Sequence, residues 1–449
     1  MLRNHRMGTR LLLLLMFAVF IAGVIQAQAV IPGVTGTSFN LAAREGYLST
    51  GDGNSFYAWG FAIDNEWMQY PGPTIIVNQN DAVTITLTND LPAWAGNVSI
   101  LFPGLSVQAS GGQAGQLTRE APPDGATTVT YTFTATRPGT FLYHGGTRPG
   151  LQMEMGLVGA IIVRPAGFNP AAPRAYDDPV SDYDSAYDHE YLFLLSAMDS
   201  RIHDLLEFKK DLTALDEVNY LSDYFPNYYF INGRTSPDVF SEPFVEWLPH
   251  QPYNSLPRMH PGERLLMRVL NGGLKRHPFH HHGNHARVIA KQGQLLASMP
   301  GVGADLSYEV FTIESVPGET VDAIFQWTGE KIGWDIYGDP NHPDYAHDCI
   351  DNDMDGYDDV THEWCADHGK PFPVVLPEKQ NLAFGAFYSG SPFLGTMGTL
   401  PPGEGGLNPN SGYAYMWHSH DEKELTNFGL FPGGILTMLI IEPPGVPIP

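Results

Sequence analysis

The feature that most constrains the fold is a series of short apolar or alternating runs, each bounded by turn-forming residues. Residues 82–87, 127–133 and 158–163 are three such runs, rich in Val, Ile and Thr. Turns at 71–73 (Pro-Gly-Pro) and 122–125 (Pro-Pro-Asp-Gly) punctuate the chain, which holds 48 Gly and 37 Pro. Because β-branched residues favour strands and Gly and Pro end regular elements, the pattern predicts an all-β protein of short strands.

The 449 residues are too many for one ordinary domain. We predict a first β domain at residues 30–165, a linker rich in Ala, Pro, Asp and Tyr at 166–189, and a second domain at 190–449. One or two short helices are expected within 200–225. An insertion rich in Pro, Gly and Asp is expected at 339–412.

The first 29 residues have the pattern of a secretory signal peptide. Arg3, Arg6 and Arg10 precede an apolar run at 11–25, and small residues at 27 and 29 suit a cleavage site. The run is short for a membrane span, so we expect a secreted or periplasmic protein with no span after cleavage. An uncleaved anchor is the alternative. The net charge of −25 argues against nucleic acid as a partner and favours cations.

Two histidine clusters carry the chemistry of the chain. Side chains on a strand alternate between faces, so His280 and His282 share a face, as do His418 and His420. Two such strands side by side would present four imidazoles to one cavity, and imidazole binds copper, zinc, iron or nickel. The alternative is a set of surface histidines or a pH-sensitive patch.

The segments around these histidines resemble the multicopper oxidase family. Residues 277–283 (His-Pro-Phe-His-His-His-Gly) are similar to its His-Pro-x-His-x-His-Gly signature, and residues 415–420 are similar to its later histidine signature. Residues 139–144 and 156–163 resemble the end of its first cupredoxin domain. The resemblance implies two cupredoxin-like Greek-key β-sandwich domains and a copper cluster at a domain interface.

In that family a type 1 copper takes electrons from a reductant and passes them to a trinuclear cluster that reduces oxygen. By position, His277 would be a type 1 ligand and His280 a type 2 ligand. The remaining four positions would serve the type 3 pair: His144, His282, His418 and His420.

Several family positions differ in this chain. Ser419 stands where the type 1 cysteine belongs, Glu424 stands near the second type 1 histidine, and residues 430–435 hold no clear axial methionine. Three further ligand positions of the first domain hold Leu101, Pro103 and Gly146. The trinuclear cluster of the family has eight histidine positions, and five of them hold histidine in this chain: His144, His280, His282, His418 and His420.

Other groups are candidates to complete the metal set. The acidic candidates are Glu154, Asp421, Glu422 and Glu424, which would shift the preference towards harder ions such as manganese or iron. A regular strand would turn His281 to the opposite face. His285 is either an added ligand or a loop residue.

The only cysteines, Cys349 and Cys365, are expected to form a disulfide in an oxidising compartment, with free thiols as the alternative. They flank an acidic loop that resembles the start of a calcium-binding loop. Its expected calcium ligands are the side chains of Asp351, Asp353, Asp355 and Asp359, with the carbonyl of Tyr357. His362 replaces the glutamate of an EF-hand, and a solvated acidic turn is the alternative.

Three functions are compatible with these observations. The first is a copper oxidoreductase without a type 1 site, acting on a small-molecule or metal-ion reductant. The second is a non-catalytic metal-binding protein outside the cytoplasm, and the third is a structural protein. Two-domain relatives form homotrimers in which the first domain of one subunit faces the second domain of another. The same contact within one chain is the alternative.

Overall fold

The computed structural model describes residues 31–217, 220, 222–330, 332–333, 348–368, 370, 390–392, 413–442 and 446–448. The predicted signal peptide lies outside the described residues, as does most of the predicted insertion. Among the described residues, none of the helices has the length and apolar character needed to cross a membrane.

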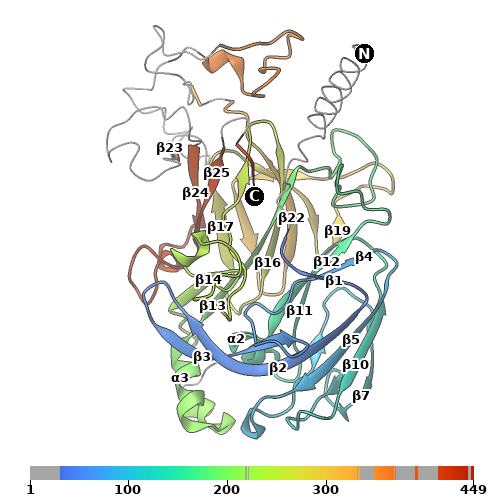
Figure 1. Cartoon of the computed structure of the whole chain (residues 1–449), viewed down its shortest axis with the longest axis vertical. Helices are drawn as coiled ribbons and strands as arrows, with labels where there is room; N and C mark the ends of the chain where they lie inside the picture. Colours follow the sequence, from blue (N-terminus) through green and yellow to red (C-terminus); the bar gives the residue numbers. More distant parts are fainter. Residues whose placement is uncertain are drawn as a thin grey trace, which may run out of the picture.

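The first β-sandwich is built from two five-stranded sheets (Figure 1). One has the order β1-β4-β12-β11-β6, with bounds Val34–Thr35, Ile75–Asn78, Val158–Arg164, Gly139–Gly145 and Ile100–Leu101. The other has the order β3-β2-β5-β10-β7, with bounds Ser55–Ile63, Ser38–Ser49, Ala82–Asn89, Val129–Thr134 and Gln108–Gly111. A hairpin of β8 (Gln113–Ala114) and β9 (Arg119–Glu120) is paired separately from both.

The second β-sandwich also has two sheets. One has the order β14-β13-β16-β22-β18-β19, with bounds Tyr228–Ile231, His189–Met198, Arg264–Asn271, Thr320–Gln326, Ala286–Lys291 and Gln294–Leu295; β20 (Tyr308–Val310) pairs with β18. The other has the order β15-β25-β24-β17-β21, with bounds Arg258–Met259, Leu436–Ile441, Tyr413–Ser419, His277–His281 and Thr312–Ser315; β23 (Gly390–Pro392) pairs with β24. The predicted all-β class is confirmed.

Helices are few and short. The helices expected within 200–225 are α3 (Ser200–Lys209), capped by the Asp199 side chain, and the 3-10 turn η2 (Leu212–Glu217). The helix α2 (Pro149–Glu154) follows β11. The other 3-10 turns are η1 (Ala93–Ala95), η3 (Asp238–Phe240), η4 (Cys365–Asp367) and η5 (Glu422–Leu425).

The burial of each strand reports how many of its faces are covered. In β5 buried residues alternate with more accessible ones, as expected for a sheet with one covered face. In β11 and β12 every residue is buried. Phe141 points into the core of the first sandwich, whereas its neighbour Leu142 packs with Leu194 and Phe230 of the second sandwich. The sheet that carries β11 is therefore covered on both faces.

A buried ion network crosses this interface between the sandwiches. Arg268 donates from Nε to Glu190 at 3.0 Å, and Arg164 of the first sandwich donates to the same carboxylate at 2.7 Å. Arg268 also donates to the hydroxyl of Thr140 at 2.9 Å, and that hydroxyl donates to Asp322 at 2.6 Å. Burial alone would raise the pKa of Glu190, but the two arginines hold it below its usual value.

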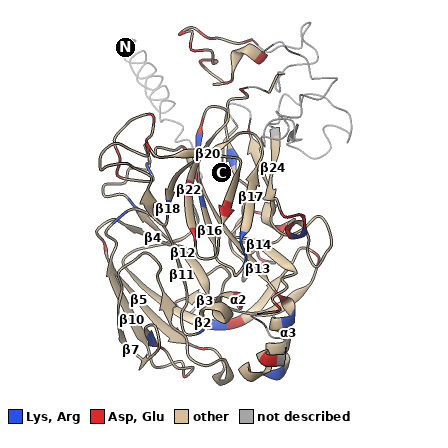
Figure 2. Ribbon diagram, turned by 180° about the vertical axis from the view of Figure 1, so that it is seen from behind, with Lys and Arg blue, Asp and Glu red and all other residues tan. Residues whose placement is uncertain are grey.

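The predicted linker is packed onto this network. Tyr176 is buried and donates from its hydroxyl to Asp322 at 2.6 Å. Tyr187 accepts a hydrogen bond of 2.8 Å from Arg164. Figure 2 shows that most of the length of the sheets is uncharged, with charged residues in the loops, around α3 and at scattered strand positions.

We expect Glu190→Gln to lower the free energy of unfolding by roughly 3–5 kcal/mol, because two buried guanidinium groups would lose their shared counter-charge. Urea denaturation would measure the change. Glu314→Gln is the control, since its 3.7 Å pair with Arg276 is exposed and its loss should cost at most about 0.5 kcal/mol. Equal effects of the two substitutions would contradict the role assigned to the network.

Candidate metal centre

Four histidines lie on, or directly after, two neighbouring strands of the second sandwich: His280, His282, His418 and His420. β17 and β24 pair antiparallel, and this register places His280 opposite His418. Phe279 and Trp417, the residues that alternate with them, pack into the core between the two sheets. The histidines therefore point to the outer face of their sheet.

Three of these imidazoles converge. His280, His282 and His418 each offer a nitrogen atom within 4.8 Å of the others. The Nε2 atoms of His282 and His418 are 3.1 Å apart, and the ring centres of His280 and His282 are 4.6 Å apart. The His420 ring centre lies 4.9 Å from that of His280, although His420 is exposed. The nitrogen donors suit copper, zinc, iron or nickel.

The other ring nitrogen of two of these histidines has a fixed partner. His418 Nδ1 lies 2.7 Å from the carbonyl oxygen of Ser419, so Nδ1 carries the proton and the Nε2 lone pair faces the cluster. His280 Nδ1 lies 2.9 Å from the hydroxyl of Thr312 on the adjacent strand β21. Contacts of this kind orient metal-ligating histidines. Sequence reasoning missed Thr312, because no motif marks the pairing of β21 with β17.

The histidines of the cluster are held neutral. Burial lowers the pKa of His280 to about 4 and that of His282 to about 3, and the neighbouring histidines lower both. Burial also lowers the pKa of His418. Near pH 7 these imidazoles offer lone pairs to a cation without first losing a proton.

Two further histidines of this segment lie outside the cluster. His281 is fully buried, and its ring lies against Phe325 and Trp417. It points to the opposite face from His280, as the alternation predicts. His285 lies in the turn after β17 with its ring 5.9 Å from that of Phe311, outside the converging group of the described residues.

The position that the resemblance assigns to a type 1 copper holds a hydrogen-bonded cluster. His277 Nδ1 donates to Oε2 of Glu424 at 2.9 Å, and Ser419 Oγ donates to the same oxygen at 2.6 Å. All three residues are at most 2% exposed. These residues supply no thiolate, so they do not fit a blue copper ion. The serine bonds to the carboxylate and not to the imidazole, which is not the arrangement of a nucleophilic triad.

His144 lies on β11 of the first sandwich, opposite Leu101 on β6. Burial lowers its pKa, and its Nδ1 lies 2.8 Å from the carbonyl oxygen of Gly145, which leaves Nε2 free of that contact. A β-carbon at Gly146 would lie 2.7 Å from Cγ of Leu101 and 2.8 Å from Oγ of Ser99. A histidine at position 146 therefore needs a shift of these neighbours.

In the described part of the chain, His144 is not in the group of His280, His282 and His418. β11 packs against β16 and β22, which belong to one sheet of the second sandwich. The clustered histidines lie on the outer face of the other sheet, and Figure 1 shows β17 and β24 on the side of the second sandwich away from β11. Within one chain, His144 is therefore separated from the clustered histidines by the second sandwich.

The carboxylates considered as additional ligands lie outside the converging group of the described residues. Glu154 accepts hydrogen bonds from the backbone of Asp199 at 2.6 Å and from the hydroxyl of Tyr224 at 2.7 Å. Asp421 caps η5, and Glu422 in the same turn is exposed. Glu424 belongs to the buried cluster with His277.

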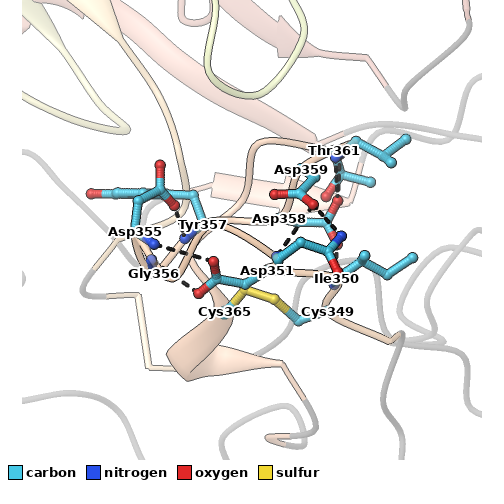
Figure 3. The surroundings of a disulfide bond; sticks show 12 residues. Cys349, Ile350, Asp351, Asp355, Gly356, Tyr357, Asp358, Asp359, Thr361 and Cys365 are labelled. Carbon is cyan, nitrogen blue, oxygen red and sulfur yellow. Dashed lines mark hydrogen bonds between the residues drawn. A yellow bond between two sulfur atoms is a disulfide. The ribbon is translucent and has the colours of Figure 1, made fainter.

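A disulfide joins Cys349 to Cys365, which confirms the predicted pairing. Figure 3 shows the acidic loop folded around it. Side-chain oxygens of Asp351, Asp353 and Asp359 lie within 4.8 Å of one another. Three of the four carboxylates predicted for calcium are therefore brought together.

The fourth predicted carboxylate has a different partner. Asp355 accepts a hydrogen bond of 2.8 Å from the backbone of Tyr357 and is not in that group. Sequence reasoning also missed Asp358, which accepts from the backbone of Ile350 at 2.7 Å and ties the two ends of the loop together. Burial would raise the pKa of Asp358, but the backbone N–H donors lower it to about 2.

Comparison with known proteins finds similarity over part of this chain. The family model "Multicopper oxidase" matches residues 62–167. L-ascorbate oxidase of Cucurbita pepo var. melopepo is 35% identical over 134 residues, which are 28% of this chain and 20% of that protein. Laccase-1 of Emericella nidulans is 34% identical with the same coverage. These matches span about a fifth of the length of the curated relatives.

Solved structures share the fold over nearly the whole chain. The multicopper oxidase mgLAC has a TM-score of 0.51 and 18% identity, covering 93% of this chain and 88% of that one. The blue copper oxidase from Nitrosomonas europaea has a TM-score of 0.50 and 17% identity, covering 91% and 86%. At such identities the likeness shows the cupredoxin-like fold.

We expect the free energy of unfolding of the metal-free protein to fall as the pH drops from about 6.5 towards 4. The pKa values of His280 and His282 are lowered to about 4 and 3, so the unfolded chain binds more protons in this interval. A His280→Asn/His282→Asn variant should lose less stability between pH 7 and 4.5, by roughly 2 kcal/mol for each histidine removed, in urea denaturation. An unchanged pH dependence would argue that these rings do not titrate differently in the folded protein.

Proposed function

Because the chain belongs to the multicopper oxidase family, we propose that it is an exported oxidoreductase that binds copper at the histidines of β17 and β24. The observation that carries this proposal is the convergence of His280, His282 and His418 within 4.8 Å. Their low pKa values and the oriented Nδ1–H of His418 support the binding of a cation.

The residues around the centre would have distinct roles. The rings of His280, His282 and His418 would hold the metal, and His420 beside them would add a ligand from the exposed side. The carbonyl of Ser419 holds the proton of His418 away from the metal. When bound, copper would supply one-electron redox chemistry.

A second copy of the chain would complete the centre. The histidine face of β17 and β24 points outward, and His144 lies on the far side of the second sandwich. A homotrimer in which a first sandwich covers this face would bring the partner's His144 to the cluster. This arrangement would enclose three or four imidazoles from one subunit and one from the next.

Electron entry would differ from that of a laccase. His277 and Ser419, which the resemblance assigns to the type 1 copper position, are hydrogen-bonded to Glu424 instead. We infer that a small-molecule or metal-ion reductant would deliver electrons directly to the histidine centre. The same observation favours a second candidate function, a non-catalytic protein that binds copper outside the cytoplasm.

The acidic loop is proposed to bind calcium in a structural role. Asp351, Asp353 and Asp359 provide the hard oxygen donors that calcium prefers. The disulfide between Cys349 and Cys365 would limit the entropy lost when the loop closes on the ion.

We expect the copper-loaded protein to retain one or two copper ions per chain without an intense blue band near 600 nm, roughly where copper–thiolate absorbs. Elemental analysis and absorption spectroscopy on one sample would test this. His282→Ala/His418→Ala should lose the copper held by this cluster and so retain fewer copper ions per chain than the unmodified protein. The control His250→Ala should keep it, because His250 packs near Trp67, away from the cluster. Copper retained equally by both variants would contradict the site.

Oxygen consumption with phenolic and metal-ion reductants would then separate the two candidate functions. Turnover that disappears in His282→Ala/His418→Ala supports the oxidoreductase. Stoichiometric copper with no turnover supports the binding protein.

We expect calcium to raise the melting temperature of the protein, because it would neutralise three carboxylates held close together. Asp351→Asn/Asp353→Asn should abolish the rise in a thermal shift measurement. Asp348→Asn, an exposed change outside the converging group, is the matched control. A melting temperature that is independent of calcium in the unmodified protein would refute the calcium loop.

A further inference from the structure

A second histidine group lies at the start of strands β13 and β16. His189 is the first residue of β13 and pairs with Leu265 of β16. His260 and Glu263 belong to the tight turn that precedes β16, in which the backbone of Glu263 donates to the carbonyl of His260 at 3.3 Å. The parallel pairing of β13 with β16 thus brings the turn to His189. The three side chains each offer a ligand atom within 4.8 Å of the others.

The two imidazoles approach the same carboxylate from different segments, His189 from β13 and His260 from the turn before β16. His189 Nε2 lies 2.9 Å from Oε2 of Glu263, and His260 Nδ1 lies 3.1 Å from Oε1. His189 is 2% exposed and His260 is 9% exposed. The Glu263 side chain retains 17% exposure, which leaves room for water beside it.

The orientation of His260 points to a cation in this group. Its Nε2 lies 2.7 Å from the carbonyl oxygen of Val446, an acceptor only, so Nε2 carries a proton. In the neutral ring Nδ1 then has a bare lone pair, which faces a carboxylate oxygen at 3.1 Å. Two electron-rich atoms at this distance require either a proton or a metal ion between them. A backbone carbonyl that holds the outer N–H is also the usual second contact of a metal-ligating histidine.

We propose that His189, His260 and Glu263 form a second metal site, separate from the histidines of β17 and β24, for a divalent first-row transition ion such as Zn²⁺. Two imidazoles and one carboxylate are a known protein ligand set for zinc, with the remaining position open to water. The N···O separations of 2.9 and 3.1 Å are hydrogen-bond distances, so the side chains would move apart by a few tenths of an ångström to reach the roughly 3.4 Å between ligands of a tetrahedral zinc ion. The proposal does not depend on the proposed copper function.

The competing occupant is a proton. His260 as an imidazolium would donate to both Glu263 and Val446 and would satisfy the same contacts without any metal. The two occupants differ in what the folded protein retains after dialysis. Only a metal site would retain one metal ion per chain after dialysis and lose that ion when the Glu263 carboxylate is removed.

The test uses the full chain with His280→Ala, His282→Ala and His418→Ala, so that the first cluster no longer binds metal. After loading with zinc and dialysis, we expect elemental analysis by mass spectrometry to find one zinc ion per chain. Glu263→Gln in this background keeps the size of the side chain and should weaken zinc binding at least 100-fold in competition with a chromophoric chelator. Glu314→Gln, an exposed change elsewhere, should have no effect.

X-ray absorption and a second pair of variants test the site even if the triple variant or the Glu263 variant does not fold. X-ray absorption at the zinc edge should report two imidazoles and light-atom ligands on the folded protein, without needing the Glu263 variant. If the triple variant does not fold, the unmodified chain and Glu263→Gln are compared, and a difference of one zinc per chain supports the site. No zinc retained by folded protein, or equal zinc in the Glu263→Gln and Glu314→Gln chains, overturns the proposal in favour of the proton.

Discussion

The arrangement of this protein depends on the buried ion network between its two sandwiches. Arg268 and Arg164 share Glu190, while Thr140 links Arg268 to Asp322. A buried ion pair is weak evidence of net stability, but each charge here would be costly without its partner. If one sandwich slid over the other, these charges would separate. The ion network therefore fixes the orientation in which the apolar surfaces of the two sandwiches pack. That orientation places β11 against β16 and β22.

The candidate metal centre follows from this orientation and from strand geometry. The inner face of β17 and β24 is taken by Phe279 and Trp417, which leaves His280 and His418 on the outer face. Since β11 covers the other sheet, His144 and these histidines cannot meet within one chain. An assembly of several copies is the arrangement that would join them, which makes the oligomeric state part of the proposed function.

All three candidate sites present ligands for cations. The chain carries a net charge of −25, and polar donors converge at the outer histidines, in the disulfide-bounded acidic loop and at the start of β13 and β16. Each place combines the donors differently: imidazole alone, carboxylate alone, and imidazole with carboxylate. Ligand type is the main chemical basis on which proteins separate copper, calcium and zinc. The position of His277, where Glu424 accepts two hydrogen bonds, is instead closed by the protein itself.

The sequence by itself determined the features that depend on neighbours along the chain. The strand positions, the shared face of His280 and His282, the inward turn of His281 and the Cys349–Cys365 pair all follow from a period of two residues or from the absence of other partners. Tertiary structure alone decided the contact of His280 with Thr312, the buried cluster of Glu424, the separation of His144 and the group around Glu263. These features join segments far apart in the sequence, and strand pairing and sandwich packing leave no local pattern from which such contacts can be read.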